Sequence, residues 1–224
     1  MTASASLLAR SCIEAKREQQ LAVSLGQVMG LPNRAMVHAR IDKQPVHVWR
    51  TLTAMSRSFD LAADYQDNVE QVHKAFGDEQ YWLARLADSG ADESTLDSIR
   101  VGADGRIDVM TTQVLARDRL PAIVAQIHKG DLLVKREESW TAINGGEATG
   151  HIIGTMPGVP VTLSGTGQLT PHPDGIGTRL ACQATVDARI PLVGAKIEKF
   201  IGKQLMDLLI TRQHFTNVWI SENS

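Results

Sequence analysis

A change of hydrophobic period near residue 95 is the feature that most constrains the fold of this chain. From residue 95 to residue 190, apolar and polar residues alternate, and short breaks rich in Gly, Pro, Asp and Asn interrupt the alternation. Alternation with period two is typical of strands that bury one face, and strands joined by such short turns must run antiparallel. The sequence therefore predicts an antiparallel sheet.

Seven strands and two short helices are expected before the C-terminal part of the chain. The strands are predicted at residues 56–63, 95–101, 106–115, 132–143, 148–156, 161–170 and 178–190. Asp67 or Asn68 can cap a first helix that ends at Gly77, and a second helix follows around Tyr81 to Leu86. A loop or short helical turn is expected near Leu120.

After Pro191 the pattern predicts one long helix that reaches about residue 220. At 100° per residue, one face of it is apolar and the opposite face carries lysines and other polar residues. The apolar face holds Ile197, Ile201, Leu208, Phe215 and Trp219. Such a helix must cover apolar surface, so we predict an α+β fold in which a curved antiparallel sheet of about six to seven strands grips the helix.

The charges divide the chain into two unlike segments. Residues 1–54 carry seven Lys and Arg against three acids, whereas the remainder carries 16 against 22, which gives +4 and −6 for a total of −2. The first segment has little regular apolar surface to bury. We predict a basic N-terminal extension at 1–54, disordered or loosely helical, before a domain at 55–224. A targeting segment and an upstream stretch before a natural start at Met55 both remain open.

Composition and spacing exclude several functions. Aromatic residues are only 4% and the net charge is −2, so no nucleic-acid partner is expected. No apolar run is long enough to span a bilayer, which predicts a cytoplasmic protein without integral membrane association. Cys12 and Cys182 match neither zinc nor disulfide spacing, and no metal or cofactor is expected.

Small residues on the predicted inner face of the sheet have two explanations. Leu163, Gly165 and Gly167 share one face of their strand, and Cys182 and Ala184 share the corresponding face of the last strand. Glycine lets a strand bend or a helix approach closely, but small side chains under a helix also leave room for a ligand cavity. Both explanations stay open.

Polar residues interrupt two of the apolar faces. Arg136 and Glu138 share a face with Trp140, and Gln204 and Arg212 lie on the apolar side of the C-terminal helix. Isolated charges are costly to bury, so these residues should be paired, solvated at a cavity mouth or facing a polar ligand group. For Arg136 and Glu138, the pattern favours an exposed edge with ordinary surface ion pairs.

Four stretches carry a resemblance to a known family. They are Ala75-Phe76-Gly77-Asp78-Glu79-Gln80-Tyr81-Trp82-Leu83-Ala84-Arg85-Leu86, Leu120-Pro121, Glu138-Ser139-Trp140 and, most specifically, Ile190-Pro191-Leu192-Val193-Gly194-Ala195-Lys196-Ile197-Glu198. With the order of elements, they resemble the actinobacterial domain of unknown function 2505 family. That family looks like a branch of the START-like, polyketide cyclase (SRPBCC) superfamily with the helix-grip fold. The resemblance implies a hydrophobic cavity for lipids, sterols or polyketides, and it brings no catalytic residue.

The leading hypothesis is a protein that binds a hydrophobic or amphipathic small molecule between the sheet and the C-terminal helix. The predicted walls are Trp140, Leu163, Gly165, Cys182, Ala184, Ile197, Ile201, Leu208 and Phe215, with Gln204 or Arg212 orienting the ligand. One alternative is a cyclase or dehydratase that uses Glu138 or His151 as acid or base. Another is a protein-interaction module with a filled interior and an apolar surface patch. The sequence does not predict an oligomeric state.

Overall fold

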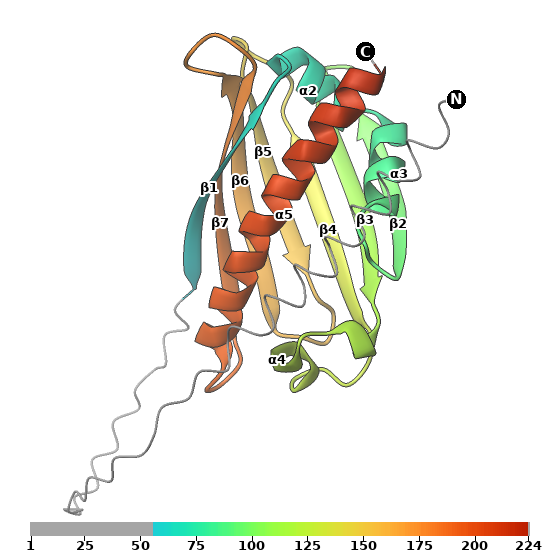
Figure 1. Ribbon diagram of the computed structural model, residues 1–224, viewed down its shortest axis with the longest axis vertical. Helices are drawn as coiled ribbons and strands as arrows, with labels where there is room; N and C mark the ends of the chain where they lie inside the picture. Colours follow the sequence, from blue (N-terminus) through green and yellow to red (C-terminus); the bar gives the residue numbers. More distant parts are fainter. Residues whose placement is uncertain (1–55, 224) are drawn as a thin grey trace, which may run out of the picture. The chain divides into compact units, whose positions relative to one another are not determined.

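The computed structural model describes residues 56–223, which form one seven-stranded antiparallel sheet and the helices that cover it (Figure 1). The strands are β1 (Arg57–Tyr65), β2 (Glu93–Val101), β3 (Ile107–Leu115), β4 (Leu132–Trp140), β5 (Ala148–Thr155), β6 (Val161–Pro171) and β7 (Thr178–Ala188). Their order across the sheet is β1-β7-β6-β5-β4-β3-β2. The alternation therefore predicted all seven strands and their antiparallel pairing correctly.

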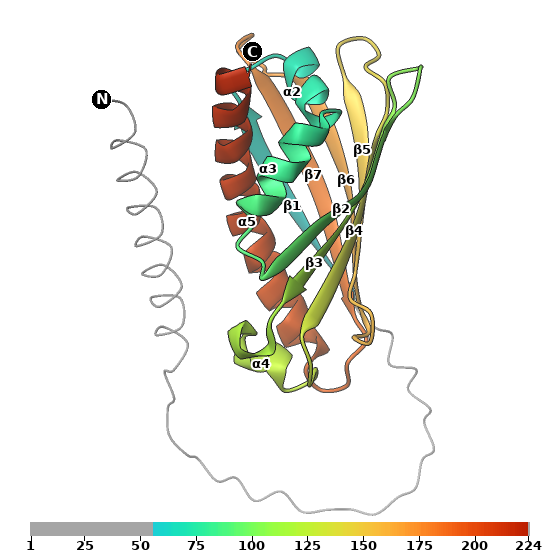
Figure 2. The ribbon, with the colours of Figure 1, turned by 90° about the vertical axis from the view of Figure 1, so that its right-hand side faces the viewer.

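The helices lie on one face of this sheet. They are α2 (Val69–Phe76), α3 (Glu79–Ala87), a single turn α4 (Ala122–Ala125) and the long α5 (Gly194–Asn223). Figures 1 and 2 show α5 crossing the curved sheet, with α2 and α3 on the same side. This is the predicted α+β helix-grip arrangement, with α5 extending three residues beyond its predicted end.

The first strand joins the sheet far from its sequence neighbours. β1 pairs with β7 along its whole length, from Arg57 opposite Val186 to Tyr65 opposite Thr178. The chain then crosses to the far edge through α2 and α3. A capping box starts α2, because the Asn68 side chain accepts from the Gln71 amide and the Gln71 side chain accepts from the Asn68 amide. Of the two predicted caps, Asn68 is the one used.

The interior contains two hydrophobic clusters at different positions along α5. The aromatic cluster gathers Tyr65, Phe76, Tyr81, Trp82 and Trp140 with the C-terminal half of α5. The aliphatic cluster gathers Val161, Val186, Ala188 and Ile197 with its N-terminal half. The two ends of the helix therefore cover different kinds of surface.

The face that α5 turns to the sheet differs at two positions from the predicted one. Leu208 is 40% exposed and Gln204 is exposed, whereas Leu205 and Leu209 pack against the core. Because α5 crosses the curved strands obliquely, the buried positions near its middle are one residue further along the chain than predicted. The placement of Leu208 on the buried face is therefore wrong.

A tryptophan fills the space beneath two glycines of the sheet. Trp140, Gly150, Gly167 and Cys182 stand in one row across β4, β5, β6 and β7. A Cβ atom at Gly150 would lie 2.8 Å from three indole atoms of Trp140, and one at Gly167 would lie 3.2 Å from Cη2 of the same ring. At these positions glycine permits a close approach of the indole. The space beneath Gly167, one of the small inner residues, is therefore filled by the Trp140 side chain and is not part of a cavity.

The most specific family motif builds the junction between β7 and α5. Leu192 adopts a left-handed backbone conformation with φ of 68°, and Gly194 follows where a Cβ atom would collide with the Ala188 carbonyl oxygen. Glu198 is buried, and its Oε1 accepts a hydrogen bond from the Ala188 amide at 3.2 Å. The motif therefore fixes the angle at which α5 returns over the sheet.

The predicted extension at residues 1–54 lies outside the described residues, and it remains a prediction. Within residues 56–223, no helix combines the length and the apolar character needed to cross a membrane.

Replacing Gly150 by Ala should lower the free energy of unfolding by about 1–3 kcal/mol, because the added methyl group overlaps the Trp140 ring. Urea titration followed by tryptophan fluorescence measures the change. Gly130→Ala is the matched control, because the nearest atom to its new Cβ would be 3.8 Å away on His128. Equal stability of the two variants would contradict the packing described here.

Candidate functional site

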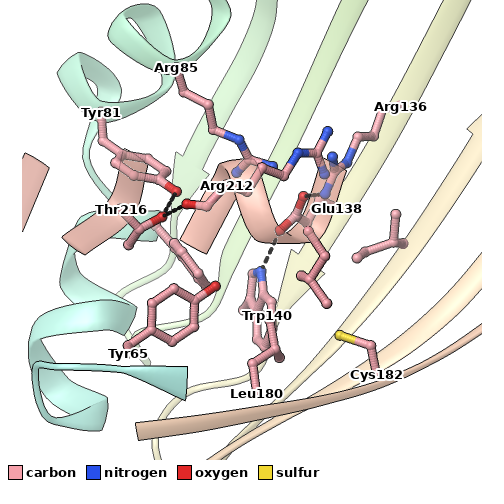
Figure 3. A pocket seen from close by; sticks show the side chains of 13 residues that line it. Tyr65, Tyr81, Arg85, Arg136, Glu138, Trp140, Leu180, Cys182, Arg212 and Thr216 are labelled. Carbon is pink, nitrogen blue, oxygen red and sulfur yellow. Dashed lines mark hydrogen bonds and ion pairs between the residues drawn. The ribbon is translucent and has the colours of Figure 1, made fainter. Parts of the chain in front are cut away.

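A pocket of about 60 Å³ lies between the sheet and the C-terminal half of α5, inside the aromatic cluster (Figure 3). Its lining residues come from β1, α2, α3, β4, β5, β7 and α5. They are Tyr65, Phe76, Tyr81, Arg85, Arg136, Glu138, Trp140, Ile152, Leu180, Cys182, Leu209, Arg212 and Thr216. The walls are mainly apolar and aromatic, with a charged group at one side.

That charged group is centred on Glu138, which is only 5% exposed. One carboxylate oxygen, Oε1, accepts a hydrogen bond from Trp140 Nε1 at 3.0 Å, and the other, Oε2, pairs with Nη2 of Arg136. The expected alternative of an exposed edge is wrong for this pair, because β4 lies between β3 and β5 and turns both side chains inward.

Arg85 and Arg212 bring two more guanidinium groups to the same pocket. Arg85 on α3 stacks on Trp82, with its guanidinium carbon 4.4 Å from the ring centroid. On α5, Thr216 Oγ1 donates to the Arg212 carbonyl oxygen at 2.8 Å, so its contact with the Tyr81 hydroxyl, also 2.8 Å, uses the tyrosine as donor. The tyrosine and threonine thereby fasten α3 to α5 beside the arginines.

The surroundings of Glu138 keep it ionised. Burial opposes the carboxylate charge, but the guanidinium groups of Arg136 and Arg85 and the hydrogen bonds from Trp140 and Arg136 outweigh burial, so the pKa of Glu138 lies below its ordinary value. Burial also lowers the pKa of Arg136, against the attraction of Glu138. Desolvation raises the pKa of Cys182 to about 11, so its thiol is protonated at neutral pH and is not a nucleophile.

The sequence-predicted site residues are only partly brought together. Trp140, Cys182, Arg212 and Glu138 all line the pocket. Phe215 lies beside it in the aromatic cluster, with its ring centroid 5.7 Å from that of Tyr81.

The remaining predicted residues lie elsewhere. Leu163, Ile197 and Ile201 belong to the aliphatic cluster, and Ala184 and Gly165 pair with each other in neighbouring strands. His151 is exposed, one residue before the pocket-lining Ile152 and therefore on the opposite face of β5. Gln204 and Leu208 are exposed on α5.

Sequence reasoning missed the contribution of the two short helices and of β1. Tyr81 and Arg85 stand four residues apart on α3, as Arg212 and Thr216 do on α5, so each pair shares one helical face. The four-residue spacing could have predicted that the two members of each pair reach the same site. Nothing in the local pattern of Tyr65 indicates that it reaches the pocket, because its position depends on the pairing of β1 with β7.

Among residues 56–223, no group of three or more His, Cys, Asp and Glu side chains is arranged to hold a metal ion.

A curved antiparallel sheet that grips a long C-terminal helix is the helix-grip, START-like fold, and here a pocket lies between the sheet and the helix. The chain belongs to the family described as "Protein of unknown function (DUF2505)", which it matches over residues 60–220. It is 47% identical over 173 residues to uncharacterized proteins of Mycobacterium bovis and Mycobacterium tuberculosis, covering 75% of this chain and 99% of theirs.

Solved structures show similarity at low sequence identity. A Thermus thermophilus protein matches with a TM-score of 0.48 and 15% identity, over 76% of this chain and 99% of its own. The di-domain ARO/CYC StfQ from the steffimycin biosynthetic pathway matches with a TM-score of 0.48 and 10% identity, over 76% of this chain and 52% of its own.

Replacing Glu138 by Gln should lower the free energy of unfolding by about 3–5 kcal/mol, because it leaves buried guanidinium groups without their counter-charge. Chemical denaturation at neutral pH measures this loss. Glu137→Gln, a change of the exposed neighbour on the outer face of β4, is the matched control and should be close to neutral. A loss no larger at Glu138 than at Glu137 would refute the buried cluster.

The stability that Glu138 adds to the natural protein, relative to Glu138→Gln, should depend on pH. A carboxyl group whose pKa is lowered by folding adds stability that is complete above its ordinary pKa of about 4.3 and is lost as the pH falls through the lowered value. The difference in unfolding free energy between the natural protein and Glu138→Gln should therefore shrink as the pH falls from about 5 to about 2. Other acidic groups cancel in this difference. A difference that stays constant over this range would contradict the lowered pKa.

Proposed function

We propose that this protein binds an amphipathic small molecule, and that part of the ligand enters the pocket between the sheet and α5. The observation that supports the proposal is that apolar and charged side chains line the same pocket. Aromatic and aliphatic walls from Phe76, Trp140 and Leu209 adjoin a buried charged cluster around Glu138. Ligand sites in proteins typically combine mostly apolar walls with a few polar groups that fix orientation.

The pocket size limits what can enter it in this arrangement. Sites for drug-sized ligands have volumes of about 300–1,000 Å³, whereas this pocket has about 60 Å³. Because one water molecule needs at least about 10–15 Å³ of such space, the pocket has room for a few water molecules. One end of a ligand fits here. A whole sterol or polyketide would require the wall formed by α5 to move outward.

The predicted cyclase or dehydratase alternative finds less support from the two candidate acid–base residues. Glu138 is held as a carboxylate by Arg136 and Arg85, so it has no proton to donate at neutral pH and is a weakened base. His151 is exposed and lies on the opposite face of β5 from the pocket-lining Ile152.

The interaction-module alternative rests on a different observation. The outer side of α5 exposes apolar side chains, at Met206, Leu208, Ile210 and Val218. A protein partner on this surface would leave the pocket unused, so a test that fills the pocket separates the two functions.

Replacing Cys182 by Trp should weaken binding of a dansyl-labelled fatty acid by about tenfold or more, because the indole would occupy the pocket between β7 and α5. Fluorescence titration of the full chain measures the affinity. Ala181→Trp places the same residue on the exposed face of the same strand and should bind as the natural protein does. Thermal unfolding of each variant checks that a loss of binding does not reflect a loss of fold. Ile152→Phe is a second pocket-filling variant and should weaken binding in the same way.

Equal affinity in the natural protein, Cys182→Trp and Ala181→Trp would remove the pocket from the proposed function and would favour the outer surface of α5.

A further inference from the structure

The pocket has more positive than negative charge. Three guanidinium groups line it, from Arg85, Arg136 and Arg212, and Glu138 is the one carboxylate among the described lining residues. The balance at neutral pH is therefore +2 within a space of about 60 Å³. The three guanidinium groups are half-buried, so they lose part of their hydration and a surplus of positive charge among them calls for an explanation.

The single carboxylate balances one of the three guanidinium charges and leaves the other two. Its Oε1 accepts from Trp140 and its Oε2 is paired with Arg136, so both oxygens of Glu138 are engaged by those two residues. Arg85 stacks its guanidinium on Trp82. That contact attracts the cation without neutralising it, since an aromatic ring has no net charge.

A buried donor also points to a missing acceptor. Arg136 Nε has no hydrogen-bond partner within the described part of the chain, although it is shielded from solvent. Almost all buried donors in folded proteins are satisfied, so an orphaned guanidinium N–H beside a pocket indicates an acceptor that enters from outside the chain.

We propose that this pocket seats the carboxylate end of an amphipathic ligand, with Arg85, Arg136 and Arg212 as the cationic groups that receive it. The inference rests on the proposed function and names the ligand class for the same site. The planar fork of a guanidinium group presents paired N–H donors that match the two oxygens of a carboxylate.

The pocket walls suit the carbon atoms that follow such a head group. Phe76, Leu180 and Leu209 line the apolar part of the pocket. A pocket of about 60 Å³ limits what enters to one end of a ligand, so the rest of a longer chain must extend beyond it. A cationic head group would add to the existing surplus of positive charge, and a neutral one would leave that surplus in place.

The experiment compares three ligands that differ only in the head group: octanoate, octan-1-ol and octylammonium. Isothermal titration of the full chain at neutral pH and moderate salt should give an affinity for octanoate about tenfold or more above that for octan-1-ol, with octylammonium weakest. Equal affinities for octanoate and octan-1-ol would overturn the carboxylate seat and leave the proposed function standing. Failure of all three to bind would count against the proposed function itself.

A pair of variants tests the cationic groups directly. Arg212→Gln should weaken octanoate binding by about tenfold and leave octan-1-ol binding unchanged, because only the charged head group uses the guanidinium. Arg85→Gln, on a different helix, should repeat this selective loss. Arg100→Gln, an exposed change on β2, is the matched control and should affect neither ligand. If both pocket variants bind octanoate as the natural protein does, the proposal is wrong.

Discussion

The packing of Trp140 is the constraint on which both the core and the pocket depend. Its indole lies against β5 and β6 because Gly150 and Gly167 have no Cβ atom in the way. Its Nε1 then donates to Glu138, and the same carboxylate holds Arg136 on the inner face of β4. The Trp140 side chain therefore fills the space between the sheet and α5 and also positions the charged side of the pocket. A substitution at Gly150 or Gly167 would for this reason also alter the site.

The charged cluster distinguishes this interior from a plain hydrophobic core. Desolvation alone would favour neutral groups, yet the two nearby guanidinium groups keep Glu138 ionised. A carboxylate held in this way stabilises positive charge and does not readily exchange a proton. The surplus of guanidinium groups around it is the charge that the proposed carboxylate ligand would balance.

The fold was predictable because its signals are local, and the site was less so because it depends on pairing between distant segments. Alternation with period two and turn residues predicted the seven strands, and the apolar face after Pro191 predicted α5. Whether the small residues of β6 and β7 leave a cavity could not be decided from the pattern, since the answer depends on where the Trp140 ring lies. Arg85 reaches the pocket because β1 pairs with β7 at one edge of the sheet and the chain then crosses through α2 and α3 to the other edge.

The most direct test of this account is the position of a bound ligand on the protein. Nuclear Overhauser contacts between isotope-labelled protein and octanoate report which side chains lie beside the first methylene groups. A ligand seated in the pocket should give contacts to the Trp140 indole and the Leu209 methyl groups, both of which line it. Contacts confined to Met206 and Ile210, on the exposed side of α5, would contradict it.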